Sequence, residues 1–97
     1  MATESSHRLA VILHADVVDS TALVRQDERV AHERIQAAFQ AFAEVLGTHG
    51  GAAKEIRGDA LVAEFPRVAN AVVAALHAQR ENALRNASHT DGIAPVI

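Results

Sequence analysis

The sequence predicts an α+β fold in which helices cover one face of a mostly antiparallel sheet. Strand-like runs at residues 9–13, 52–57 and 60–65 alternate with segments whose apolar residues recur at helical spacing. The length of 97 residues and the hydrophobic content of 49% suffice for one core. We therefore expect one domain over residues 8–97, preceded by a flexible N-terminal segment at residues 1–7.

The first strand is expected at residues 9–13, where a continuous apolar run has a β-branched centre. Such a run favours a central strand that is covered on both faces. Asp19 and Ser20 follow, and their side chains can accept hydrogen bonds from the free amides at the start of a helix. Thr21 then begins this helix.

A longer helix is predicted from Asp27 onward, because large apolar residues recur at spacings of 4, 3 and 4. The glycines at positions 47, 50 and 51 should end this helix. The apolar residues should face the core, and they are Ile35, Phe39, Phe42 and Leu46.

A β-hairpin is predicted at residues 52–65. Gly58 and Asp59 separate its two strands, and a two-residue connection of this kind tolerates the positive φ angles of a tight turn. Pro66 ends the second strand. Gly58 by itself would indicate a turn and nothing more.

The last helix is expected from Val68, with a loop at residues 88–92 after it. One face of this helix should carry the apolar residues Ala69, Val72, Val73, Leu76, Ala83 and Leu84. Residues 93–97 are apolar and predict the beginning of another strand, so the chain is expected to be a fragment.

The order of elements is β-α-α-β-β-α, truncated at the start of the next strand, and it favours a ferredoxin-like antiparallel sheet with helices on one face. In that topology the first and third strands are neighbours, which brings Asp16 and Asp59 together. Two carboxylates about 4 Å apart repel by roughly 1 kcal/mol in water and about 4 kcal/mol at a partly buried site. A proton or a cation is therefore needed between them, and Mg²⁺ is the usual cation.

Composition argues against several classes of function. The net charge is −3 and the sequence has no basic run, which argues against a nucleic-acid partner. The absence of cysteine excludes disulfides and thiolate metal sites. The polar N-terminus and the short apolar runs predict a cytoplasmic protein without membrane insertion. The six histidines lack a repeated metal-ligand spacing, so we interpret them as surface residues, with only His14 near the proposed site.

Two segments of the sequence resemble the N-terminal half of the class III adenylate/guanylate cyclase catalytic domain. They are ADVVDST at residues 15–21 and RGDALVAEF at residues 57–65, and the resemblance extends over roughly residues 8–87. It implies that Asp16 and Asp59 are catalytic and hold two Mg²⁺ or Mn²⁺ ions, with help from the backbone carbonyl of Val17. It also implies that the loop of Asp19, Ser20 and Thr21 cradles a triphosphate.

The resemblance implies a purine nucleotidyl cyclase, in which the ions activate the ribose 3′ hydroxyl of ATP or GTP for attack on the α-phosphate. The products are cyclic AMP or cyclic GMP and pyrophosphate, in cyclic-nucleotide signalling. Many family members carry glycine where this chain has Asp19. The position that reads the base holds lysine in adenylate cyclases and glutamate in guanylate cyclases. Here it is Glu55, which favours GTP, whereas a shift of one residue would present Lys54 instead.

Other interpretations remain open. The asparagine and arginine that stabilise the transition state in the family lie beyond this sequence, so the chain alone is expected to be inactive. Such a chain could also be a degenerate cyclase-like module for dimerisation or nucleotide sensing, or another ferredoxin-like domain that shares only the acidic pair. Asp16 could be only a strand end and Asp19 only a helix cap. An unpaired edge of the first strand predicts a homodimer, or a strand-exchanged oligomer formed through residues 93–97.

Overall fold

The computed structural model describes residues 9–97, so the expected flexible segment at residues 1–7 lies outside the described part of the chain. The predicted α+β class and its β-α-α-β-β-α order are confirmed. The elements are β1 (Val11–Asp16), α1 (Ser20–Gln26), α2 (Glu28–Thr48), β2 (Ala52–Arg57), β3 (Ala60–Phe65) and α3 (Val68–Asn86).

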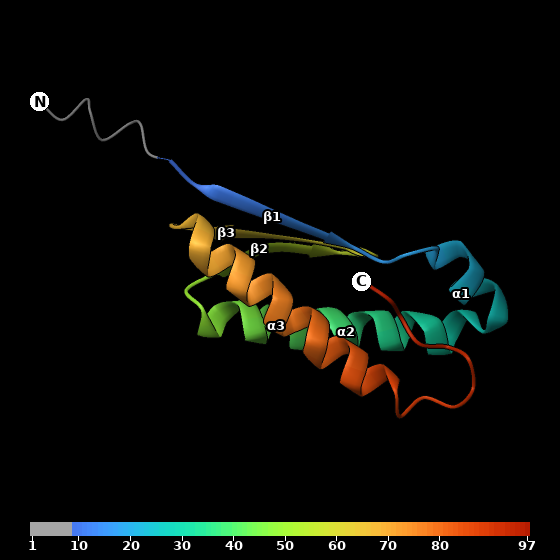
Figure 1. Cartoon of the computed structure of the whole chain (residues 1–97). Helices are drawn as coiled ribbons and strands as arrows, with labels where there is room; N and C mark the ends of the chain where they lie inside the picture. The colour runs from blue at the N-terminus through green and yellow to red at the C-terminus, as the bar shows by residue number, and fades with distance from the viewer. Residues whose placement is uncertain (1–8) are drawn as a thin grey trace, which may run out of the picture.

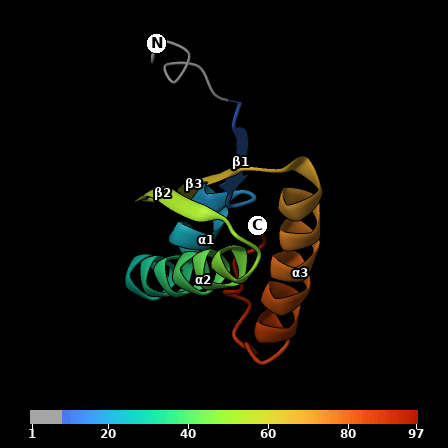
Figure 2. The same cartoon turned by 90° about the vertical axis from the view of Figure 1, so that its left-hand side faces the viewer.

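The three strands form one antiparallel sheet in the order β1-β3-β2, so the first and third strands are neighbours as predicted. The hairpin is confirmed, with Gly58 in the turn at a φ of 57°. Helices α2 and α3 lie on the same side of the sheet, whereas α1 lies beyond the end of β1 and packs against α2 (Figures 1 and 2). In Figure 2, α3 stands beyond the β1 side of the sheet, whereas α2 runs beneath the other strands.

The prediction that the first strand is covered on both faces was wrong, whereas the expected unpaired edge of this strand is confirmed for the described sheet. The strand begins at Val11 and lies at one edge of the described sheet, next to β3 alone. Ile12 is 58% exposed and Leu9, before the strand, is 96% exposed. The helices cover only one face, so the residues of β1 that point to the other face meet solvent.

The core lies between the sheet and the helices. The predicted core residues of α2 are buried, with Phe39 and Leu46 fully so. Every second residue of β3 meets them from the sheet, because successive side chains of a strand point to opposite faces. These residues of β3 are Leu61, Ala63 and Phe65.

The predicted core face of α3 was wrong. Val72 and Leu76 are more than half exposed, whereas the helix turns small residues inward at spacings of three and four: Ala71, Ala74 and Ala78. Small side chains allow the helix axis to approach the neighbouring elements closely, and α3 packs mainly against α2. The larger apolar residues of α3 therefore remain on its outer face.

Residues 93–97 do not begin a strand, which corrects the sequence-based expectation. They have no regular secondary structure, yet Ile93 and Pro95 are buried in this same chain. The amide of Val18 donates a 2.7 Å hydrogen bond to the carbonyl of Val96. In residues 9–97, no helix combines the length and the apolar character that a membrane crossing requires.

Candidate functional site

The candidate site lies at the corner where β1 ends and the β2–β3 hairpin turns. Asp16 is the last residue of β1 and lies opposite Ala60, the first residue of β3. Asp59 immediately precedes Ala60 in the turn, and its carbonyl accepts a 3.1 Å hydrogen bond from the amide of Val17. The antiparallel register therefore brings the backbones at Asp16 and Asp59 side by side.

Each of the two carboxylates has one oxygen engaged by a neighbour. Asp16 Oδ1 accepts from the amide of Val17 at 2.9 Å, and Asp59 Oδ2 accepts from Ser20 Oγ at 2.9 Å. The other oxygens, Asp16 Oδ2 and Asp59 Oδ1, accept no hydrogen bond from residues 9–97. Both aspartates are exposed, so these oxygens are available to a cation or to water.

Asp19 occupies the N-cap position of α1, but its side chain makes no capping hydrogen bond, so the predicted role as a side-chain cap was wrong. Its backbone is left-handed, with φ 49° and ψ 54°. The cap is formed instead by its carbonyl, which accepts from the amides of Ala22 at 3.1 Å and Leu23 at 3.4 Å. A non-glycine residue in this conformation carries a steric cost, which asparagine and aspartate tolerate better than most.

The loop after β1 has two kinds of backbone amide. The amides of Val17 and Val18 donate within the chain, to Asp59 and Val96 respectively. Those of Asp19, Ser20 and Thr21 donate no hydrogen bond to any residue that the structure describes. Their N–H groups therefore remain available at the start of α1, beside Asp59.

The register of the hairpin separates Glu55 from Lys54. Glu55 lies opposite Val62, which in turn lies opposite His14 of β1, and a bulge leaves Lys54 without a partner on β3. Residues that lie directly opposite each other share a face of the sheet. Glu55 and His14 therefore lie on the same outer face as Asp16, and the bulge is what places Glu55 there.

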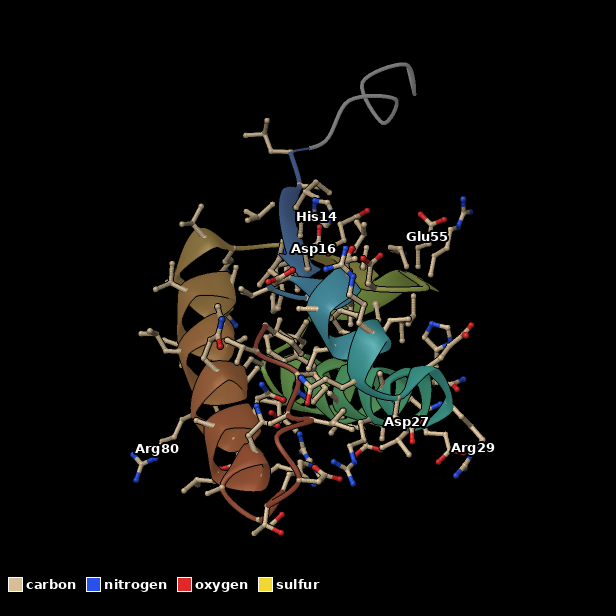
Figure 3. The ribbon with its side chains drawn as sticks, turned by 90° about the vertical axis from the view of Figure 1, so that its right-hand side faces the viewer. His14, Asp16, Asp27, Arg29, Glu55 and Arg80 are labelled. Carbon is tan, nitrogen blue, oxygen red and sulfur yellow. The ribbon has the colours of Figure 1, made fainter. Side chains whose placement is uncertain are left out.

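Glu55 is nevertheless remote from Asp16. It forms an ion pair with Arg57 on the same strand, and β3 lies between it and β1. Two strand spacings correspond to about 10 Å across a sheet. In Figure 3, His14 and Asp16 lie next to each other, while Glu55 stands at the opposite edge of the sheet.

A pocket of about 470 Å³ opens on the other side of the hairpin, between the turn and the first two helices. Asp59 and Ser20 belong to its wall, so it borders the acidic corner. Sequence reasoning missed its remaining lining, because the pocket arises from the packing of separate elements rather than from a motif. Those residues are Val24, His32, Ile35, Gln36, Ile56 and Gly58.

The carboxylate oxygens of Asp16 and Asp59 suit a hard cation that also keeps water or phosphate oxygens as ligands. Within residues 9–97, no three His, Cys, Asp or Glu side chains are placed to hold a metal together. Carboxylate oxygens match Mg²⁺, which usually takes one or two protein carboxylates and completes its octahedron with water and substrate phosphates. The residues present therefore fit Mg²⁺ or Mn²⁺ in the presence of a phosphate ligand.

Comparison with known proteins adds one similarity. The chain is 38% identical over 88 residues, or 89% of its length, to a protein of Rhizobium meliloti (strain 1021) named "Putative adenylate cyclase 3". The chain is cyclase-like in sequence. It spans about 15% of the length of that relative. No protein-family model matches the chain.

Proposed function

We propose that this chain is the metal-binding half of a purine nucleotidyl cyclase domain. In the complete parent protein, that domain would convert ATP or GTP into a cyclic nucleotide and pyrophosphate. The observation that carries the proposal is the corner formed by Asp16, Asp59 and Ser20, which come from the end of β1, the β2–β3 turn and the start of α1. The similarity to a cyclase-named protein over most of the chain supports the same assignment.

In this proposal Asp16, Asp59 and the carbonyl of Val17 hold Mg²⁺ or Mn²⁺. Bound there, the ions would lower the pKa of the ribose 3′ hydroxyl and neutralise charge on the phosphates. Ser20 keeps the Asp59 side chain turned toward the start of α1 through its hydroxyl. Asp59 can therefore face the place where a phosphate chain would lie.

The start of α1 would hold the triphosphate. The free amides of Asp19, Ser20 and Thr21 can donate to phosphate oxygens, and negative charge is favoured at the N-terminus of a helix. The carboxylate of Asp19 opposes this attraction, because it is exposed at the same place and is not engaged as a cap. Its charge should weaken, but not abolish, binding of a nucleoside triphosphate.

Glu55 would read the base, as a hydrogen-bond acceptor that matches the donors on guanine. The bulge at Lys54 supports this choice, because it puts Glu55 on the face of Asp16. The ion pair with Arg57 holds the carboxylate of Glu55 at the edge strand. A base bound there would replace or share that contact.

A module for dimerisation or nucleotide sensing without turnover is the alternative. The features that favour it are the charge of Asp19 beside the phosphate loop and the pairing of Glu55 with Arg57. The charge of Asp19 and the ion pair of Glu55 would each weaken the binding of a nucleotide, but neither changes the positions of Asp16 and Asp59. Such a module would still bind metal and triphosphate at Asp16 and Asp59.

Binding of fluorescent GTP and ATP analogues to the full chain, in the presence of Mn²⁺, tests the proposal. We expect saturable binding that is lost with a chelator and reduced more than tenfold in an Asp16→Asn, Asp59→Asn variant. The matched control is Glu28→Gln, Glu44→Gln, which makes the same change of charge at two exposed positions of α2. The control should bind as the wild type does.

Two further variants test the details of the site. Asp19→Asn removes the charge but keeps a residue type that tolerates the left-handed backbone, so it should bind triphosphate several-fold more tightly. Glu55→Gln should lower the preference for GTP over ATP. A folded chain that binds neither analogue, or binds them equally well without Asp16 and Asp59, would overturn the proposed site.

A further inference from the structure

Residues 92–97, here called the strap, are held by side chains from three helices although they form no regular element. Gln26 of α1 donates to the carbonyl of Gly92 at 3.5 Å, and Arg34 of α2 donates to that of Ile93 at 2.8 Å. Three amides of α3 complete the set. Asn82 and Asn86 both donate to the carbonyl of Pro95, at 3.0 and 2.7 Å, and Gln79 donates to that of Ile97 at 2.6 Å.

Asn82 is notable because it is a buried amide, with 3% of its surface exposed. Its Nδ2 group donates to Pro95, but its Oδ1 atom has no hydrogen-bond partner among the described residues. An unsatisfied buried acceptor destabilises a fold, and an apolar side chain of similar shape would avoid that cost. The amide of Asn82 is therefore placed for a single contact among the described residues, the hydrogen bond to the strap.

The strap leads directly to the candidate site. The carbonyl of Val96 accepts a 2.7 Å hydrogen bond from the amide of Val18. Val18 lies between Asp16 and the loop of free amides that begins at Asp19. The hairpin holds Val17 through the carbonyl of Asp59, and the strap holds the next residue, so two separate parts of the fold fix consecutive residues of the loop.

We infer that Asn82 and Asn86 are positioning residues for the metal and phosphate corner, acting through Pro95 and Val96 on the loop at Val18. This inference rests on the proposed function. Neither amide touches the corner itself. By holding the carbonyl of Pro95, they keep the adjacent carbonyl of Val96 in place for Val18, and so they order the backbone between Asp16 and Ser20.

The test compares the full chain with an Asn82→Leu, Asn86→Leu variant. The matched control is Asn70→Leu, because Asn70 lies on the same helix and also donates to a loop carbonyl, that of His49, away from the strap. Amide hydrogen exchange followed by NMR reports on Val18, with Leu46 of the core as reference. Calorimetric titration reports the affinity for Mn²⁺ in the presence of a GTP analogue.

In the double variant we expect the rate of amide exchange at Val18 to rise at least tenfold relative to that at Leu46. We also expect the affinity for Mn²⁺ to fall by roughly tenfold, which is the usual effect of removing a residue that orients a metal ligand without touching the metal. Asn70→Leu should change neither the exchange rate at Val18 relative to Leu46 nor the affinity for Mn²⁺. A purely structural role would raise exchange at Val18 and Leu46 alike, and that result would overturn the inference. Unchanged Mn²⁺ affinity despite faster exchange at Val18 would overturn it as well.

Asn86→Leu alone provides a milder variant, because Asn86 is only partly buried, and it should shift both quantities in the same direction. Failure of the proposed function would look different. In that case the wild-type chain would bind no Mn²⁺ through Asp16 and Asp59. The exchange ratio at Val18 would then decide the role of the strap by itself, with an unchanged ratio overturning it.

Discussion

At the scale of single residues, Gly51 lies where the core has no space for a side chain. It lies between α2 and β2, beside the ring of Phe65, which is 1% exposed. A Cβ atom at Gly51 would overlap that ring and approach the carbonyl of Leu46 to 2.9 Å. Gly47, four residues earlier, has nothing within 4 Å of such an atom.

We expect alanine substitutions at these two glycines to have opposite effects. Gly51→Ala should lower the free energy of unfolding by roughly 1–3 kcal/mol, because a ring or the backbone must move. Gly47→Ala should raise it by roughly 0.5–1 kcal/mol, because alanine favours the helix at a place with open space. Urea denaturation of both variants checks the pair. Equal effects would contradict the packing at Gly51.

At the scale of elements, α3 separates its apolar residues by size. The alanine face is turned inward, and Ala74 is fully buried, whereas Leu76 is 67% exposed. Arg80, on the same helix, projects away from the body of the molecule in Figure 3. The helix therefore contributes to stability through close approach rather than through large buried side chains.

Two substitutions on α3 should distinguish its faces. Ala74→Leu should cost roughly 1–3 kcal/mol of unfolding free energy, because the buried face has no room for a larger side chain. Leu76→Ala should change that energy by less than about 0.5 kcal/mol, since most of the side chain already meets solvent. Thermal or urea unfolding measures both. A large loss in Leu76→Ala would show instead that a partner covers this face.

At the scale of the whole molecule, a charged pair joins the long helix to Asp91, the residue just before the strap. Arg34 of α2 contacts Asp91 at 2.6 Å, and the amide of Ile93 donates to the same carboxylate oxygen at 3.1 Å. The hydrogen bond from Arg34, followed by that from Ile93, lowers the pKa of Asp91 from 3.8 to about 2. Residues more than fifty positions apart are joined by this contact.

The pH dependence of stability should reflect this pair. Because the folded state has the lower pKa for Asp91, the pair stabilises the fold above about pH 4 and loses that effect as the pH falls toward 2. We expect the thermal midpoint to decline more steeply over this range in the wild type than in Asp91→Asn. Parallel curves for the two proteins would show that Asp91 contributes no such stabilisation.

Local sequence signals were sufficient for the order of elements and for the hairpin. The helical spacing from Ile35 to Leu46 and the Gly58-Asp59 turn act within a few residues, so propensity and pattern predict them. The positions of Asp16 and Asp59 next to strand ends marked these two as candidates, whereas the resemblance to the cyclase catalytic domain implied the role of Ser20. Their meeting at one corner follows from topology, which the antiparallel pairing of β1 and β3 provides.

Several features of the folded chain were not contained in any local sequence pattern. They include the left-handed backbone of Asp19, the bulge that places Glu55 on the outer face, and the inward alanine face of α3, none of which the sequence analysis predicted. The strap is the clearest case. Its apolar sequence resembles a strand, yet hydrogen bonds from amides on α3 and burial of Pro95 outweigh strand propensity. Short-range preference predicted the elements, whereas long-range burial and hydrogen bonding decided which faces and loops meet at the site.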